Sequence, residues 1–338
     1  MSSTQRSVLA AVTLFFVAPL VAEFLLGDFP ATWLPVLIVL APMYGGGAIL
    51  IRELTRRSGR GWPTILLLGV AYAIIEEAFT TQTLFNPDIF GMHMHLLSHA
   101  WIPALGIGAW WTLFMLNVHA FWSIGVSIAL VEGLYPSRTR TPWLGNIGLS
   151  VAAVLFVIGA VYNTWYTFHH DPFRATHKQF LVSALLVVVF AVAAFLIPKP
   201  VPSSDPSPVP SPWIIGAATF ILGAAVFLAP VSLNWIAVVW ILAVDLVFLL
   251  GIGLFSRCVG WTPLHTLSVG AGGALLYGAH AFMQGPIVPC TKGVALASHA
   301  LFMVLAIAVI AIAARRTHAA LLTGAKLDPD AGTGTETN

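Results

Sequence analysis

The chain has 338 residues, of which 58% are hydrophobic and only 8% are charged, with a formal net charge of +2. In a soluble domain roughly a quarter of the residues are charged, so this composition cannot build a water-exposed surface. So small a net charge also gives no electrostatic basis for binding nucleic acid. Most of the chain must face lipid or other apolar helices, where the hydrogen bonds of the backbone have to be satisfied within each helix. The sequence thus predicts an all-α, polytopic helical bundle with the lipid bilayer as its partner.

A helix that crosses a bilayer needs roughly 20 largely apolar residues. In chain order, we expect such helices at about 7–27, 32–51, 63–83, 110–134, 143–163, 179–197, 213–230, 235–256, 262–283 and 293–314. The protein is therefore expected to cross the membrane about ten times.

The basic residues of the loops predict the orientation, because cytoplasmic loops are enriched in Lys and Arg. With a cytoplasmic N-terminus, only Arg174, Lys178 and Lys292 fall outside. The remaining basic residues fall inside: Arg6, Arg52, Arg56, Arg57, Arg60, Arg138, Arg140, Lys199, Arg257, Arg315, Arg316 and Lys326. Both termini are thus expected in the cytoplasm. The compact loops are typical of a protein of the bacterial cytoplasmic (inner) membrane.

Composition divides the chain into four regions. Residues 1–197 form a six-helix membrane region, and residues 213–316 form a four-helix region. Residues 198–212 are rich in Pro and Ser, so we expect a stiff, extended cytoplasmic linker. The tail 317–338 lacks the apolar residues to pack and is expected to be disordered in the cytoplasm.

Two adjacent carboxyl groups, Glu76 and Glu77, lie inside the third predicted helix. A charged side chain at the bilayer centre costs about 2.5–3.5 kcal/mol on insertion scales, so it normally faces a protein interior or a wet cavity. Neighbours on a helix point about 100° apart, so we expect at most one of the two to aim squarely at a given site. Burial and mutual repulsion keep a proton available on one of them, which suits a general acid or base. We interpret Glu23 as interfacial and Asp245 as a packing or relay residue.

The fourth predicted helix places His119 within about one helical turn of Glu76 in height. Asn117 lies on the same helix, and Ser123 lies one turn from His119 on the same face. We therefore expect His119 to share a polar site with the glutamates.

The later helices add further polar residues in the outer half of the bilayer. His280 has Tyr277 and Gln284 on its side of the ninth predicted helix, and His299 falls in the outer third of the last. The polar residues thus gather from the midplane outward, which predicts a cavity open to the external side.

A Glu-Glu pair in one transmembrane helix, followed by histidines on later helices, resembles the CAAX protease and bacteriocin-processing (CPBP) family of intramembrane proteases. That family has the pattern EExxxR, FxxxH and then HxxxN or HxxxD. The resemblance implies that Glu76, Glu77, His119 and His280 activate water to cleave a membrane-embedded or lipidated peptide. Thr81 stands at the position of the motif's arginine, and Gln284 at that of its final Asn or Asp.

The sequence specifies no cofactor or metal. A b-type haem between His119, His280 and His299 is chemically possible, but no characteristic spacing supports it. A His-x-His pair can bind zinc or copper, yet we interpret the histidines of the outer loops as solvated. They are His93, His95, His99, His169, His170 and His177.

Three functional hypotheses follow. The first is an intramembrane hydrolase that uses the carboxyl pair and the histidines. The second is a proton- or cation-coupled transporter, in which the same carboxylates and Asp245 bind the ion; no broken-helix pair is visible in the sequence to support it. The third is a non-catalytic membrane scaffold with a structural polar cluster.

Overall fold

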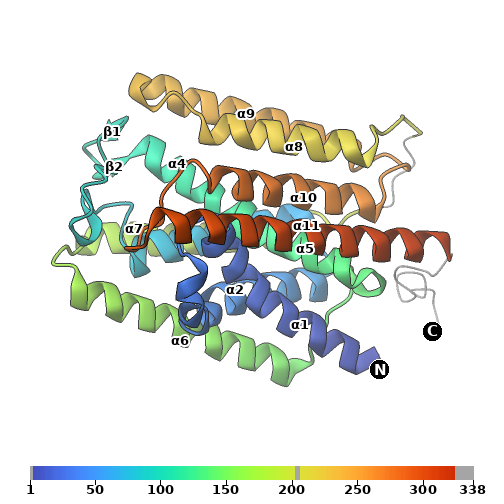
Figure 1. Cartoon of the computed structure of the whole chain (residues 1–338). Coiled ribbons are helices and arrows are strands. Elements are labelled where there is room, and N and C mark those ends of the chain that lie inside the picture. The colour runs from blue at the N-terminus through green and yellow to red at the C-terminus, as the bar shows by residue number, and fades with distance from the viewer. Residues whose placement is uncertain (1–2, 202–205, 324–338) are drawn as a thin grey trace.

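The computed structural model describes residues 3–201 and 206–323, and its helices lie side by side in one elongated bundle (Figure 1). The first half consists of α1 (Ser3–Pro19), η1 (Leu20–Leu25), η2 (Ala31–Val36), α2 (Leu37–Arg57), α3 (Trp62–Ile74), η3 (Ile75–Thr80), η4 (Ile89–Gly91), α4 (Ala109–Asn117), η5 (Val118–Val126), α5 (Ser127–Leu134) and η6 (Pro136–Arg138). The second half consists of α6 (Asn146–His170), α7 (His177–Leu196), α8 (Pro212–Phe227), η7 (Val231–Leu233), α9 (Trp235–Phe255), α10 (Pro263–His280) and α11 (Lys292–Leu322).

The prediction of a multi-pass helical membrane protein is confirmed. Among the described residues, eight helical segments are long and apolar enough to cross a membrane, and α8 is a shorter apolar helix. The amino end of α1 and the carboxyl end of α11 lie at the same end of the bundle (Figure 1). The count of about ten spans and the cytoplasmic position of the termini remain predictions.

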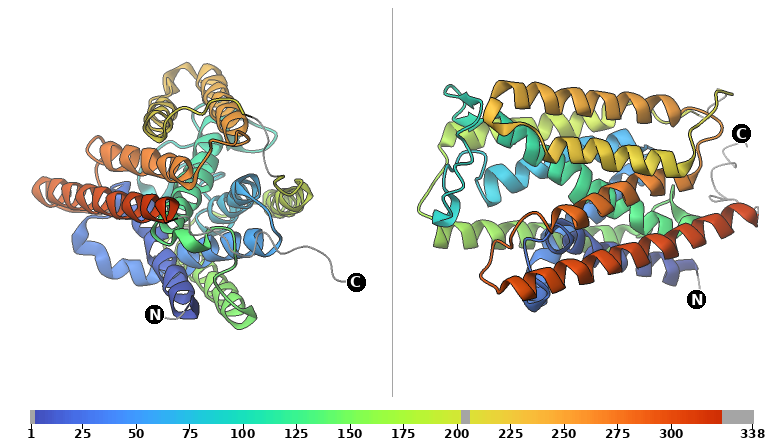
Figure 2. Two further views of the ribbon diagram at one scale, coloured as in Figure 1. Left: turned by 90° about the vertical axis from the view of Figure 1, so that its right-hand side faces the viewer. Right: turned by 45° about the horizontal axis from the view of Figure 1, so that its top comes forward.

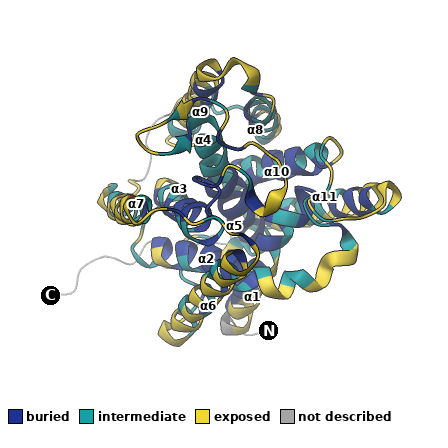
Figure 3. Ribbon diagram, turned by 90° about the vertical axis from the view of Figure 1, so that its left-hand side faces the viewer, coloured by how far each residue is buried: buried dark blue, intermediate teal, exposed yellow. Residues whose placement is uncertain are grey.

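Inner and outer helices differ sharply in burial (Figure 3). The apolar stretches of α6, α7 and α9 are each only 11% buried, and their exposed Leu and Val side chains suit contact with lipid. The span Ala109–Leu134 is 72% buried and Trp62–Thr80 is 67% buried. α8 and α9 form a hairpin at one side of the bundle, where α10 packs against α8 (Figure 2). The most protected environment is therefore around α3, η3 and η5.

A buried ion network closes one end of the bundle. Arg52 is fully buried; its Nη1 lies 2.8 Å from Glu53 Oε1, and its Nε lies 3.0 Å from Glu132 Oε1. Arg56 Nη2 lies 2.8 Å from Glu132 Oε2, and the Arg52 guanidinium stacks 3.4 Å from the Trp143 ring. The sequence prediction placed both arginines in a loop, but α2 continues to Arg57 and buries them.

The linker and the tail are described in part. Residues 198–201 and 206–211 are not helical, as expected, and residues 202–205 lie outside the described residues. α11 continues to Leu322, so the first part of the expected tail is helical. The rest of the tail, from residue 324, lies outside the described residues.

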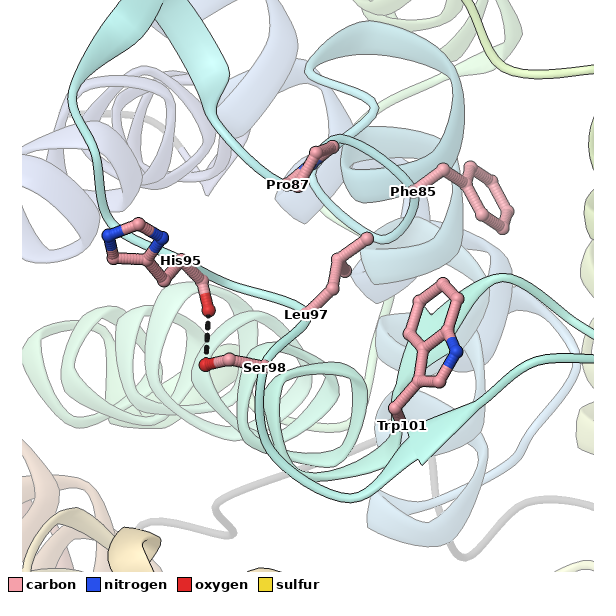
Figure 4. A pocket seen from close by; sticks show the side chains of 6 residues that line it. All are labelled: Phe85, Pro87, His95, Leu97, Ser98 and Trp101. Carbon is pink, nitrogen blue, oxygen red and sulfur yellow. Dashed lines mark hydrogen bonds between the residues drawn. The ribbon is translucent and has the colours of Figure 1, made fainter.

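The opposite end of the bundle carries a short antiparallel hairpin of β1 (Trp101–Ile102) and β2 (Ile107–Gly108). A pocket lies beside it, lined by Phe85, Pro87, His95, Leu97, Ser98 and Trp101 (Figure 4). The Ser98 hydroxyl donates to the carbonyl of His95 at 2.7 Å. This pocket is at the same end of the bundle as the carboxyl end of η3.

Candidate functional site

Three π-helical turns supply the charged residues of one buried cluster. η1 carries Glu23, η3 carries Glu76 and Glu77, and η5 carries His119. A π turn bonds residue i to i+5 and thus contains about one residue more than an α turn. π turns are rare in proteins overall, and those that occur are often found at functional sites.

The two glutamates flank a single imidazole. His119 Nε2 lies 2.7 Å from Glu77 Oε1, and Nδ1 lies 3.0 Å from Glu76 Oε2. All three residues are at most 4% exposed. We expected only one carboxyl group to reach a given site, but both contact the same ring. The physical reason is the wide turn of η3, which brings consecutive side chains closer in direction than in an α-helix.

A tyrosine joins Glu76 to a third carboxyl group. The Tyr44 hydroxyl lies 2.5 Å from Glu23 Oε1 and also makes a short hydrogen bond with Glu76 Oε1. The Tyr44 ring is tilted against the rings of Tyr72 and His119, at centroid distances of 6.1 and 6.3 Å. Glu23, Tyr44, Glu76, His119 and Glu77 therefore form one continuous chain of polar contacts. We name these five residues the Glu-His cluster.

The chain after η3 covers the Glu77 end of the Glu-His cluster. The Thr83 hydroxyl donates to Glu77 Oε2, and the amide of Thr81 donates to the carbonyl of Glu76 at 2.9 Å. Gln82 adopts a φ of +60°, which turns the chain, and its Oε1 accepts from the Ala175 amide at 2.7 Å. The segment 81–86 thus lies between the Glu-His cluster and the pocket that contains Phe85.

Glycines allow the helices to approach closely enough to form the cluster. A Cβ at Gly45 would lie 2.1 Å from the Phe15 carbonyl oxygen, so only glycine lets α2 pack this tightly on α1. A Cβ at Gly69 would lie 3.0 Å from Ala120 Cα, where α3 meets η5. These contacts bring Tyr44 beside η1 and bring η3 beside His119.

Ser123 and Asn117 have separate roles. Ser123 Oγ lies 3.4 Å from His119 Nδ1, as its position one turn away predicts. Asn117 Nδ2 donates to Asp245 Oδ2 at 3.0 Å, which joins α4 to α9. Asp245 thus has its own partner away from the glutamates.

The histidines and neighbours of the last helices do not join the Glu-His cluster. The ring of His280 lies 4.5 Å from that of Phe227, and Gln284 donates to Asp28 Oδ1 at 2.6 Å. Tyr277 stacks on Trp122 at 5.6 Å. His299 is 3% exposed, and neither ring nitrogen has a hydrogen-bond partner among the described residues. The three histidines considered for haem therefore lie in three different surroundings.

The histidines that the sequence predicted in outer loops also lie apart from the cluster, and His169 and His170 belong to the last turn of α6. His93 Nδ1 lies 3.1 Å from Asp88 Oδ2, and the rings of His169 and His170 stack on those of Trp165 and Tyr166. Within residues 3–201 and 206–323, one group of His, Cys, Asp or Glu side chains is close enough to hold a metal ion. It consists of Glu76, Glu77 and His119, whose donor atoms lie within 4.8 Å of one another.

Two members of the Glu-His cluster, Glu23 and Tyr44, were not predicted from the sequence to belong to the site. We interpreted Glu23 as interfacial, yet it bonds to Tyr44. The signal was present in the run Ala41-Pro42-Met43-Tyr44-Gly45-Gly46-Gly47, where a tyrosine precedes three glycines inside a membrane helix. Such small residues mark close helix contacts.

The fold and the site define a multi-pass helical membrane protein with a buried centre of carboxyl groups and one imidazole. A family model described as an uncharacterized membrane protein family matches residues 12–327, and the chain belongs to that family. Comparison with curated proteins gave no match, and comparison with solved structures gave none.

The family assignment corrects the resemblance to the CAAX protease and bacteriocin-processing family, because it covers nearly the whole chain and names a different family. The resemblance depended on a short acidic pair and on two histidines, and the structure brings only His119 of those two to the glutamates. Short polar motifs of this kind are weak evidence for membership of a family, because charged residues inside the membrane occur in proteins of many different functions.

Proposed function

We propose that the protein is a proton- or cation-coupled membrane transporter, and that the Glu-His cluster binds the coupling ion. The observation that carries this proposal is the Tyr44 bridge. A phenol has one hydrogen to donate, whereas ionised carboxylates only accept. Since the Tyr44 hydroxyl contacts both Glu23 and Glu76, one of these carboxyl groups must hold a proton or a cation must compensate.

The charge of the cluster supports the same proposal. Three carboxyl groups share their surroundings with one imidazole, so ionised carboxylates outnumber the available positive charge. An uncompensated charge in a low-dielectric interior is strongly destabilising. The centre therefore requires bound protons or a bound cation, and an ion held by several weak acids can be exchanged.

The helix geometry favours a functional centre over a rigid scaffold. Three spans change from α to π geometry at the residues of the cluster. η1 and η3 end their helices, and η5 lies between α4 and α5. Turns of this kind often occur at functional sites.

We also propose that the protein lies in the bacterial cytoplasmic membrane, crosses it about ten times and has both termini in the cytoplasm. The proposal also retains the division into a six-helix region, a linker and a four-helix region. The cluster lies wholly in the first region and so predicts that residues 1–197 bind the ion.

Proteoliposomes that contain a trapped pH indicator test the proposal. A gradient of Na⁺, K⁺, Mg²⁺, Mn²⁺ or Zn²⁺ is imposed in turn, and the internal pH is followed. We expect at least one cation to drive proton movement in wild-type vesicles, and we expect Glu76→Gln and Glu77→Gln to abolish it. Asp245→Asn is the matched control, since it removes a membrane carboxylate outside the cluster. Wild-type vesicles that behave like protein-free vesicles with every cation would refute transport.

A further inference from the structure

We propose that Glu76, Glu77 and His119 bind a divalent transition-metal ion, of the Mn²⁺, Fe²⁺, Co²⁺ or Zn²⁺ class. This inference deepens the proposed function, because it names the cation that the transporter would couple. It rests on the three buried side chains of Glu76, Glu77 and His119 together, not on the acidic pair alone.

The donor atoms suit this class of ion. Two carboxylate oxygens and one imidazole nitrogen lie within 4.8 Å of one another. Ligands about 2.0–2.2 Å from a tetrahedral zinc ion are themselves roughly 3.5 Å apart, so the carboxyl group on the opposite ring nitrogen must rotate toward the ion to complete this set. Imidazole ligands favour transition metals, whereas Mg²⁺ and Ca²⁺ favour oxygen alone. The donor set thus selects against the alkali and alkaline-earth ions.

One contact inside the cluster brings two possible metal-binding atoms together. Glu76 Oε2 is buried, forms no hydrogen bond among the described residues and lies 3.0 Å from His119 Nδ1. If Nε2 donates its hydrogen to Glu77, the neutral ring presents a lone pair at Nδ1. A lone pair and a carboxylate oxygen at this separation repel each other unless a proton lies between them or a cation lies beside both. A metal ion bound by both atoms would remove this repulsion.

The neighbours of the ligands hold them as metal sites require. Ligands in such sites are normally oriented by outer hydrogen bonds, whose loss costs about 10–100-fold in affinity. Thr83 donates to Glu77 Oε2, and Tyr44 bonds to Glu76 Oε1. Both proposed carboxylate ligands therefore have an outer partner already in place.

Metal binding is tested on the purified full-length protein in detergent, without any gradient. Co²⁺ is the probe, because its visible absorption reports the coordination. We expect one Co²⁺ per chain at this site and displacement of Co²⁺ by Zn²⁺. His119→Gln, Glu76→Gln and Glu77→Gln should each weaken binding at least about 10-fold.

Two further variants test the site without changing a ligand, in case a ligand variant fails to fold. Thr83→Val leaves every ligand in place and should weaken Co²⁺ binding about 10-fold through Glu77. A double variant, His93→Ala with His95→Ala, removes the exposed loop histidines and should leave the affinity unchanged. If Thr83→Val binds as wild type does and the loop variant loses the metal, the proposed site is refuted.

The outcomes separate this inference from the proposed function. Proton movement driven by Na⁺ or K⁺, without Co²⁺ binding, would overturn the metal site and leave the transporter. Co²⁺ binding that depends on Glu77 and His119, without flux in vesicles, would support the metal site and refute transport.

Discussion

Replacing Tyr44 with Phe tests the bridge on which the ion-binding argument depends. The substitution removes one hydroxyl and keeps the ring, which packs between Tyr72 and His119 at centroid distances of 6.1 and 6.3 Å. No cavity is created, so the effect reports the polar contacts. A hydrogen bond to a charged group contributes about 1.5–3 kcal/mol. We therefore expect a loss of about 2 kcal/mol in the free energy of unfolding.

Thermal unfolding of purified Tyr44→Phe in detergent, followed by tryptophan fluorescence, gives the measurement. A loss of this size corresponds to a decrease in Tm of a few degrees, roughly 2–4 °C per kcal/mol in chains of 150–250 residues and less in longer ones. Tyr162→Phe is the matched control, since Tyr162 is 41% exposed on α6 and should tolerate the change within about 0.5 kcal/mol. If Tyr44→Phe is as stable as Tyr162→Phe, the Tyr44 hydroxyl does not stabilise Glu23 and Glu76. The inference that one of these carboxyl groups holds a proton, or is compensated by a cation, is then refuted.

Three other predictions concern the fold around the cluster. Glu132→Gln leaves two buried guanidinium groups without a full counter-charge, so we expect a loss of about 3–5 kcal/mol by thermal unfolding, against less than about 0.5 kcal/mol for the exposed control Arg140→Ala. Burial, followed by the negative charge of Glu23, raises the pKa of Asp28 well above its usual value. The folded protein then binds this proton more tightly than the unfolded chain, so Asp28 lowers stability increasingly as pH rises above about 4. Asp28→Asn should therefore raise the Tm at pH 8 more than at pH 4, and an equal gain at both would contradict the assignment. Gly45→Ala should cost at least about 1–3 kcal/mol because its methyl group meets a carbonyl of α1, whereas Gly251→Ala meets nothing within 4 Å and should be neutral.

The sequence predicts the helices well because hydropathy reports directly on contact with lipid. Boundaries were less certain where polar residues are buried, as at Arg52 and Arg56, which hydropathy assigned to a loop. An ion network inside a helix end has the same composition as a cytoplasmic loop. Only the packing of α2 against the loop at Trp143 distinguishes the two.

The candidate site could be predicted in part. Rise per residue placed Glu76 and His119 at similar heights, and the structure shows them in contact. Height does not determine which helices are neighbours, and for this reason His280 was grouped with them although it packs on Phe227. The contact of both glutamates with one ring depends on a π turn, which no residue type in the sequence specifies.

If the protein is a transporter as proposed, the π turn of η3 gives this centre a way to change its affinity for the ion. Such a turn can migrate along its helix by one residue when one i→i+5 hydrogen bond is exchanged for an i→i+4 bond, and the number of backbone bonds is conserved. A shift of this kind would rotate Glu77 away from the imidazole while the helix stays intact. Affinity would then alternate by a change of helical register, with neither a hinge nor a moving domain.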